Sequence, residues 1–238
     1  MGKVSNSRID TTGPQAAGPA TTGPASRATL AQRKRQLVSD ELTEAALQLL
    51  ALKGFDAVTV DEIVTAAGVS KRTFFRYFAS KEDVVVQFLA GMGAGIRAEL
   101  AARPAGEPPS VALRHAVWVP LGECADHGDR ALRVVRLILR TPALLARFLE
   151  RQARWRDDLA WELAERLGAD ADADLYPRLA AGMALNAFDA VLHRWSADGS
   201  TESPADLTDR AFAVIAPALD AVRREVPAEG PGGSRSER

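Results

Sequence analysis

Three closely spaced helix starts in the first third of the chain constrain the fold more than any other feature. Thr59 and Glu62 have the spacing of a capping box, in which the threonine hydroxyl accepts from a first-turn amide and the glutamate reaches back. Gly68 is expected to end that helix, because glycine tolerates the left-handed conformation common after a helix C-terminus. Ser70 begins a second short helix by similar capping, and Ser80 begins a third. The pattern predicts two short helices joined by a tight turn.

The second short helix has the surface expected of a DNA-reading element. Phe74 and Phe78 are four residues apart and share one face. Cations and hydroxyls occupy the other faces, and they suit base edges and phosphates in a major groove. A small helical hairpin with a solvated basic face is the alternative interpretation. The predicted DNA-contacting residues are Thr59, Ser70, Lys71, Arg72, Thr73, Phe75, Arg76, Tyr77 and Lys81.

The run from Asp61 to Asp83 resembles the DNA-binding signature of TetR-family transcriptional regulators. The resemblance is carried by the order of Ala-Gly-Val-Ser, Thr-Phe, Tyr-Phe and Ser-Lys-Glu, and it extends over residues 30–85. It implies a ligand-responsive repressor that binds double-stranded operator DNA as a homodimer. A small apolar or acyl-type effector would release the repressor from a palindromic operator.

Composition limits the other classes of protein. The chain has 238 residues, is 47% hydrophobic and carries a net charge of −1, so any DNA contact must come from a local basic patch. Periodic apolar segments without alternating strand patterns predict an all-α fold, with a three-helix helix-turn-helix head and a helical body. We find no apolar run long enough to span a bilayer and no secretory signal, so we expect no membrane partner and a cytoplasmic location.

The chain is expected to have four segments. Its first residues are rich in Gly, Pro, Thr, Ser and Ala, and they offer too little apolar surface to offset the entropy of ordering. The cationic cluster Arg33–Arg35 is expected near DNA. The predicted segments are a disordered tail over residues 1–28, the DNA-binding head over 29–85, a ligand-binding and dimerisation body over 86–224, and a disordered tail over 225–238.

Two helix boundaries in the body are predicted from local signals. Ser110 is expected to cap a helix that Pro120 ends or kinks, because proline breaks the hydrogen-bond ladder. Residues 126–129 are expected to form a turn before another helix over residues 130–140.

Three glycines, Gly91, Gly93 and Gly95, fall inside the helix expected between Lys81 and Ala102. Each weakens a helix by up to about 1 kcal/mol relative to alanine, so they indicate either a bend or a close packing contact. In TetR regulators the equivalent helix connects head to body and transmits the ligand signal, so this resemblance implies the same role here.

The last two predicted helices are apolar on more than one face, which favours burial on several sides. A symmetric dimer that forms a four-helix bundle would bury the surplus face, and the family resemblance implies the same dimer. A larger core within one chain is the alternative. The predicted interface residues are Ala180, Ala184, Ala187, Val191, Ala211, Val214 and Ala218.

Aromatic and methionine side chains on several body helices are consistent with either plain core or the lining of an apolar cavity. The family resemblance favours a cavity, because TetR regulators commonly hold an effector in the C-terminal domain. The predicted cavity residues are Trp118, Arg136, Phe148, Trp155, Met183, Asn186 and Phe188.

A second likeness covers the middle of the body. Arg136–Leu144 and Trp155–Asp157 resemble actinobacterial TetR regulators with an acyl-CoA-like ligand-binding domain, including mycofactocin-cluster regulators. That likeness implies that Arg133, Arg136 and Arg140 face a phosphate-bearing ligand. A solvated arginine face is the alternative.

We find no catalytic motif and expect no enzyme activity, cofactor or metal. The histidines His115, His127 and His193 lack metal-binding spacing. Cys124, the single cysteine, is either a redox thiol or a small buried hydrophobe, and the second is favoured. The alternative to a regulator is a helical protein that binds or sequesters a small molecule and whose head has lost its DNA role.

Overall fold

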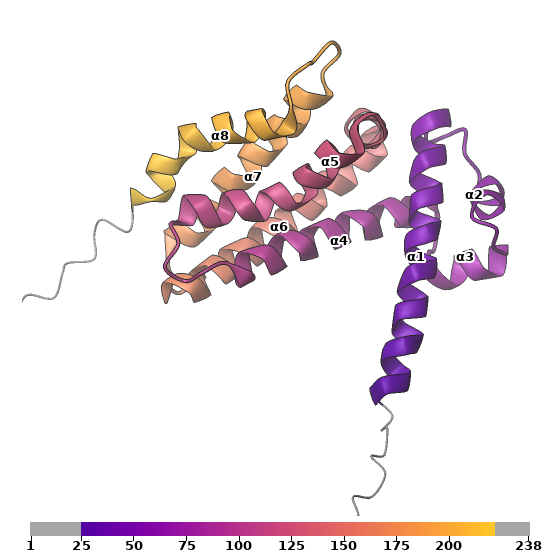
Figure 1. The fold of residues 1–238 in the computed structure, drawn as a ribbon, viewed down its shortest axis with the longest axis horizontal. Helices are drawn as coiled ribbons and strands as arrows, with labels where there is room; N and C mark the ends of the chain where they lie inside the picture. The colour runs from indigo at the N-terminus through magenta and orange to yellow at the C-terminus, as the bar shows by residue number, and fades with distance from the viewer. Residues whose placement is uncertain (1–24, 222–238) are drawn as a thin grey trace, which may run out of the picture. The chain divides into compact units, whose positions relative to one another are not determined.

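The computed structural model describes residues 25–221, with side chains from Leu30 onward, and this part of the chain is helical without strands. The all-α prediction is therefore confirmed (Figure 1). The helices are α1 (Ala25–Lys53), α2 (Val60–Ala66), α3 (Lys71–Tyr77), α4 (Lys81–Ala102), α5 (Pro109–Arg140), α6 (Pro142–Leu167), α7 (Leu175–Ser196) and α8 (Pro204–Leu219).

The chain divides into two compact units between Val38 and Ser39. The described part of the first unit is the first half of α1, whose side chains are exposed from Leu30 to Leu37. Because α1 begins at Ala25, the helix starts before the predicted end of the N-terminal tail at residue 28. The remainder of both predicted tails lies outside the described residues.

In the second unit, the head consists of the second half of α1 with α2 and α3. Leu42, Ala46 and Leu50 are spaced by four along α1 and are fully buried. Ile63 on α2 and Phe74 on α3 are also fully buried, and burying side chains of this size is a main source of stability. These residues form the small core that positions α3.

The body consists of α4 to α8, and these helices pack through many neighbouring pairs (Figure 1). Helix α4 packs on α5 and α6, α6 packs on α7, and α8 packs on both α5 and α7. Side chains from each helix fill the centre. Fully or almost fully buried examples are Ile96, Leu113, Leu159, Phe188 and Leu219.

Gly93 marks a close packing contact between α4 and α6. A Cβ atom at Gly93 would lie 2.1 Å from Nε1 of Trp155, whereas one at Gly91 would meet nothing within 4 Å. Trp155 is held in turn by edge contacts with Phe148, at 5.9 Å between ring centroids, and Phe188, at 6.2 Å. Of the two roles predicted for these glycines, close packing therefore applies at Gly93.

Helix α5 supports the prediction of two helical segments on either side of residues 126–129. Two helical segments lie between Pro109 and Arg140, and they meet at a kink at Gly128, whose φ of 43° and ψ of −117° are non-helical. A positive φ is readily accessible to glycine, so the chain changes direction at Gly128, inside the predicted turn. Pro120 lies inside α5 and does not end it.

The start of α5 is capped by a distant residue and not by Ser110 as predicted. Pro108 occupies the N-cap position, and Ser110 lies buried in the first turn. Asp220, just after α8, accepts hydrogen bonds from the Ser110 backbone amide at 3.0 Å and from its hydroxyl at 2.7 Å. A carboxylate is favourable at a helix N-terminus, so this contact joins the beginning of α5 to the end of α8.

Among the described residues, one helix, α4, is long and apolar enough by length and composition to cross a membrane, with a mean hydropathy of 1.3. The prediction that no apolar run reaches this length is therefore wrong. Core helices of soluble proteins have the same property, and Val84, Ile96 and Leu100 of α4 are fully buried in the packed chain.

Candidate nucleic-acid interface and cavity

The capping box predicted at the start of α2 is present. The Thr59 amide donates to Oε2 of Glu62 at 2.9 Å, and the Glu62 amide donates to the Thr59 hydroxyl at 3.3 Å. Hydrogen bonds from Lys53 and then from Thr59 lower the pKa of Glu62 to about 2. Because the Thr59 hydroxyl is part of the cap, its first role is to fix the orientation of α2.

The turn and the start of α3 also have the predicted geometry. Gly68 has φ 64°, the left-handed conformation that favours glycine. The Ser70 hydroxyl accepts from the Thr73 amide at 3.1 Å, and the two side-chain oxygens lie 2.9 Å apart. Ser70 and Thr73 therefore hold the first turn of α3 in place.

The exposed surface of α3 presents cations and an aromatic ring. Arg72 is exposed and has no hydrogen bond or ion pair within the described part of the chain, and Phe75 is 55% exposed. The guanidinium of Arg76 lies 5.1 Å from the centre of the Tyr77 ring. Lys71 is exposed but forms an ion pair at 2.7 Å with Asp61. Arg72 is thus the cation on α3 that is free to make a new contact.

Lys81 does not occupy the exposed surface that the sequence predicted for it. Its ammonium group donates to the carbonyl oxygens of Phe55 at 2.7 Å and Val58 at 3.0 Å. The same nitrogen lies 4.6 Å from the centre of the Phe55 ring, a cation–π arrangement. Lys81 therefore fastens the loop between α1 and α2, and its predicted DNA contact stays a prediction.

A second feature is a cavity of about 520 Å³ between α1, α4, α5, α6 and α7. Its wall is mostly apolar. At one end, where α1 meets the bend of α5, the lining becomes polar. Apolar lining residues include Leu47, Phe88, Met92, Ile138, Phe148 and Phe188, and the polar end consists of Asp40, Thr43, Glu44, Glu123, Cys124, His127 and Arg130.

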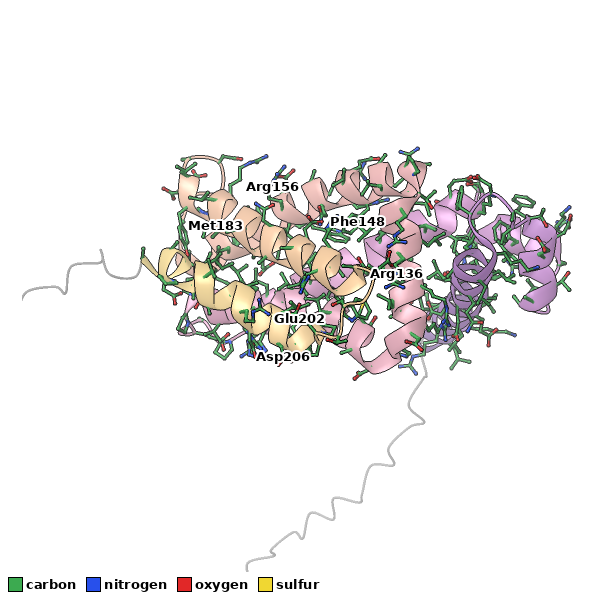
Figure 2. All side chains as sticks on the ribbon, turned by 90° about the horizontal axis from the view of Figure 1, so that it is seen from above. Arg136, Phe148, Arg156, Met183, Glu202 and Asp206 are labelled. Carbon is green, nitrogen blue, oxygen red and sulfur yellow. The ribbon has the colours of Figure 1, made fainter. Side chains whose placement is uncertain are left out.

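Two of the seven predicted cavity residues, Phe148 and Phe188, line this cavity (Figure 2 labels Phe148). Asn186 is exposed, and Met183 is only half-buried and lies outside the cavity lining. Trp155 contacts Gly93 on the α4 side of the same aromatic cluster and lines a second pocket, between α4 and α6. Trp118, also predicted, packs beside Gly122 of its own helix. Helical periodicity identified the aromatic core, but it could not show which rings border empty space.

Arg136, the remaining predicted cavity residue, binds the end of α7. Its Nε donates to the Ser196 carbonyl at 2.9 Å, and its Nη2 donates to the Ala197 carbonyl at 3.3 Å. Arg140 forms an ion pair at 2.9 Å with Asp198 in the following loop. Cations stabilise helix C-termini, so these two arginines have a structural role, and neither lines the cavity.

No sequence pattern predicts the polar end of the cavity. Glu44 on α1 and Arg130 on α5 form an ion pair at 2.9 Å there. Neither residue belongs to a recognisable motif, and only the tertiary fold brings them together. This ion pair connects a helix of the head to a helix of the body.

Cys124 also lines the cavity. Burial raises the pKa of its thiol to about 12, and the charge of Glu123 acts in the same direction. A thiol in this environment stays protonated, and only the thiolate is strongly nucleophilic. Cys124 is half-buried, and its raised pKa argues against a redox thiol.

The prediction that this face of α7 forms the dimer interface is wrong. Ala180, Ala184, Ala187 and Val191 are buried within the chain itself, because this face of α7 packs against neighbouring helices. The predicted interface residues of α8 differ, since Val214 and Ala218 are exposed and Ala211 is half-buried. The exposed apolar residues of α7 are instead Leu175 and Leu179.

A capped helix-turn-helix with an exposed cationic second helix, joined to a helical body with a cavity, defines the class of helix-turn-helix DNA-binding regulators. Comparison with known proteins identifies the particular family. Residues 42–88 match the model of bacterial regulatory proteins of the tetR family, and residues 107–220 match the MftR C-terminal domain. The chain belongs to the TetR family, and it is a transcriptional regulator and not an enzyme.

This chain matches two related regulators over almost their whole length. The chain is 35% identical over 217 residues to the HTH-type transcriptional regulator TcmR of Streptomyces glaucescens, which covers 89% of this chain and 94% of that protein. It is 31% identical over 199 residues to a Mycobacterium tuberculosis protein described as mycofactocin biosynthesis transcriptional regulator MftR, which covers 79% of this chain and 94% of that protein.

Solved structures share the fold. The fatty acid degradation regulator FadR from Bacillus halodurans aligns with a TM-score of 0.57 and 22% identity, covering 78% of this chain and 96% of that one. FadR from Bacillus subtilis, solved in complex with stearoyl-CoA, aligns with a TM-score of 0.56 and 20% identity, covering 74% of this chain and 96% of that one.

Proposed function

We propose that this regulator is a repressor that a small molecule, bound in the cavity, releases from a palindromic operator. The observation that carries the proposal is that one cavity is lined both by α1 of the head and by body helices α4 to α7. A molecule in that position contacts both parts of the chain. It can shift the DNA-binding equilibrium to the extent that it binds one arrangement of the helices better than another.

In this proposal, α3 enters the major groove with its exposed face. Arg72 has the strongest support as a base-reading residue, because its guanidinium is exposed and free of partners within the described residues. Arginine binds guanine edges through two hydrogen bonds, and Phe75 beside it suits a thymine methyl group. Lys71 and Arg76 are assigned to phosphates.

A homodimer is part of the proposal, and its interface is revised by the burial of α7. Leu175 is 77% exposed, Leu179 is 53% exposed, and Val214 on α8 is 79% exposed. Large apolar side chains with this exposure favour a second protein surface. We propose that α7 and α8 of two copies pair through these residues, which would place two heads on the two halves of a palindrome.

The size of the cavity supports a small-molecule effector. About 520 Å³ lies within the range of roughly 300–1,000 Å³ typical of such sites. The mostly apolar wall favours an apolar molecule, and rings such as Phe148 and Phe188 offer it a large contact area. The bound stearoyl-CoA of Bacillus subtilis FadR shows that this fold holds an apolar chain in that protein.

The test is a pair of arginine substitutions measured on a duplex that the protein selects from random DNA. Arg72→Ala is expected to cost about 1–3 kcal/mol of binding free energy and to relax the sequence preference at one position in each half-site. Arg133→Ala is the matched control, because Arg133 is also exposed but lies on α5 of the body. Equal affinities for both variants and the wild type would contradict a DNA-reading role for α3 and favour a small-molecule binding protein.

A further inference from the structure

We propose that the effector is an apolar molecule with a cationic head, and that this head binds Glu44 and breaks its ion pair with Arg130. The inference rests on the proposed function, because it concerns the chemistry and the regulatory action of the same cavity. It goes beyond that function in naming the charge of the effector and the contact that the effector breaks.

The two ends of the cavity differ in chemistry. The deep end is lined by Ile138, Phe148 and Phe188, of which the two rings are almost fully buried. The other end lies where α1 faces the bend of α5 at Gly128. A molecule that fills this space therefore places an apolar body against the rings and its other end among polar side chains.

Carboxylates dominate the polar end. Asp40, Glu44 and Glu123 line it, against one guanidinium, that of Arg130. The carboxylates in the lining outnumber the arginine and histidine side chains together. An anionic head would meet net repulsion at short range, whereas an ammonium group would gain charge-assisted hydrogen bonds.

A phosphate-bearing effector lacks its usual partners here. Phosphate groups are typically bound by clusters of arginine and lysine. The arginines that the sequence suggested for this role do not line the cavity, since Arg136 binds the C-terminal carbonyls of α7 and Arg140 binds Asp198. Arg130, which does line it, is already paired with Glu44.

The Glu44–Arg130 ion pair is positioned to transmit binding. Glu44 lies on α1 between Leu42 and Ala46, which are fully buried in the core of the head. Arg130 lies two residues after the bend of α5. A cation that binds Glu44 replaces the ion pair between α1 and α5 with a contact between α1 and the effector, and the head loses one of its links to the body.

A series of probes with one tail and different heads tests the charge of the effector. We would measure the Kd of decylammonium, decanol, decanoate and decanoyl-CoA for the full chain by calorimetry, below their micelle concentrations. Decylammonium is expected to bind at least about fivefold more tightly than decanoate, the ratio that one partly exposed charge pair supplies. Tighter binding of decanoate or decanoyl-CoA, or no binding of decylammonium, overturns the inference.

Three substitutions then test the residues. Glu44→Gln is expected to weaken decylammonium binding and leave decanol binding unchanged, which also shows that the cavity is intact. Glu41→Gln is the matched control, because Glu41 is an exposed glutamate of the same helix outside the cavity lining. Arg130→Gln removes the competitor of the effector, so decylammonium is expected to bind more tightly. Weaker binding to Arg130→Gln would identify Arg130 as an anchor for an anionic group and overturn the inference.

DNA release by the same probes separates this inference from the proposed function. If decanoyl-CoA binds most tightly and releases the selected duplex, the repressor proposal holds and the cationic head is wrong. If decylammonium binds in the expected order but leaves DNA affinity unchanged, the charge assignment holds, while displacement of Arg130 as a release mechanism is overturned. Release by decylammonium that disappears in Glu44→Gln and persists in Glu41→Gln supports both.

Discussion

Replacing Gly93 with alanine is expected to destabilise the body, although the same change at Gly91 is expected to stabilise it. Both glycines lie inside α4, where alanine is favoured over glycine by up to about 1 kcal/mol. At Gly91 a Cβ atom meets nothing within 4 Å, so the helix gains this amount. At Gly93 the new Cβ atom would lie 2.1 Å from Nε1 and 2.2 Å from Cδ1 of Trp155.

The cost of this overlap depends on whether Trp155 can move. Trp155 is 3% exposed, and the edges of Phe148 and Phe188 contact it at centroid distances of 5.9 Å and 6.2 Å. Displacing it therefore disturbs two further buried rings. Overpacking of this kind costs about 1–3 kcal/mol, so Gly93→Ala is expected to be less stable than Gly91→Ala by about that amount.

Urea unfolding followed by circular dichroism measures this difference through the midpoint at an unchanged slope. All variants are compared at one protein concentration, because dimerisation would make stability depend on concentration. Adding Trp155→Leu to Gly93→Ala removes the overlap, and the double-mutant cycle is expected to show a coupling of roughly 1 kcal/mol or more. A Gly93→Ala variant as stable as Gly91→Ala, or a coupling near zero, would refute the packing argument.

Three further predictions concern acid stability, thiol reactivity and assembly. The folded-state pKa of Glu62 is lowered from 4.5 to about 2, so the stabilisation by its ionised carboxylate is complete above about pH 4.5 and is lost as the pH falls toward 2. The difference in stability between wild type and Glu62→Gln should therefore shrink between pH 5.5 and 3. A constant difference would argue against the capping role. The pKa of the Cys124 thiol is raised to about 12, so little of it is ionised at pH 8. Cys124 should therefore react with a disulfide reagent at pH 8 at least about tenfold more slowly in the folded protein than in urea. Equal rates would contradict the raised pKa. Leu179→Glu should yield monomers in sedimentation experiments. Leu52→Glu replaces another exposed leucine, in the head, and should leave the dimer intact. If Leu179→Glu dimerises with unchanged affinity, the interface lies elsewhere.

Features fixed by local hydrogen bonds could be predicted from the sequence. The caps at Thr59, Ser70 and Ser80 each involve a side chain and an amide three residues later, and all three are present. Gly68 has the positive φ expected of it. Because the turn and both flanking helices depend on such short-range contacts, the DNA-binding element was correctly placed.

Features decided by distant partners could not be predicted. Ser110 has the composition of a cap, but Asp220 supplies the cap from the far end of the chain. Lys81 looks like a surface cation beside a DNA-binding helix, yet two carbonyls of a preceding loop bind it. Periodicity could not reveal which face of α7 the chain covers itself, so the buried face with Ala184 was mistaken for the interface.

The cavity could be predicted from the sequence only in part. Phe148 and Phe188 were identified because aromatic residues are conspicuous in a helical pattern. Its polar end depends on Glu44 and Arg130, which meet only after α1 and α5 have packed, so no sequence signal could have found it.

Selection of bound duplexes from a random DNA pool, with binding measured over a range of salt concentrations, tests whether α3 reads DNA in a dimeric repressor. The expected result is an inverted repeat whose halves lie about one helical turn apart, with specific binding that persists at roughly 0.15 M salt. Enrichment without a common sequence, together with affinity that disappears as salt increases, would contradict the claim that α3 reads DNA in a dimeric repressor.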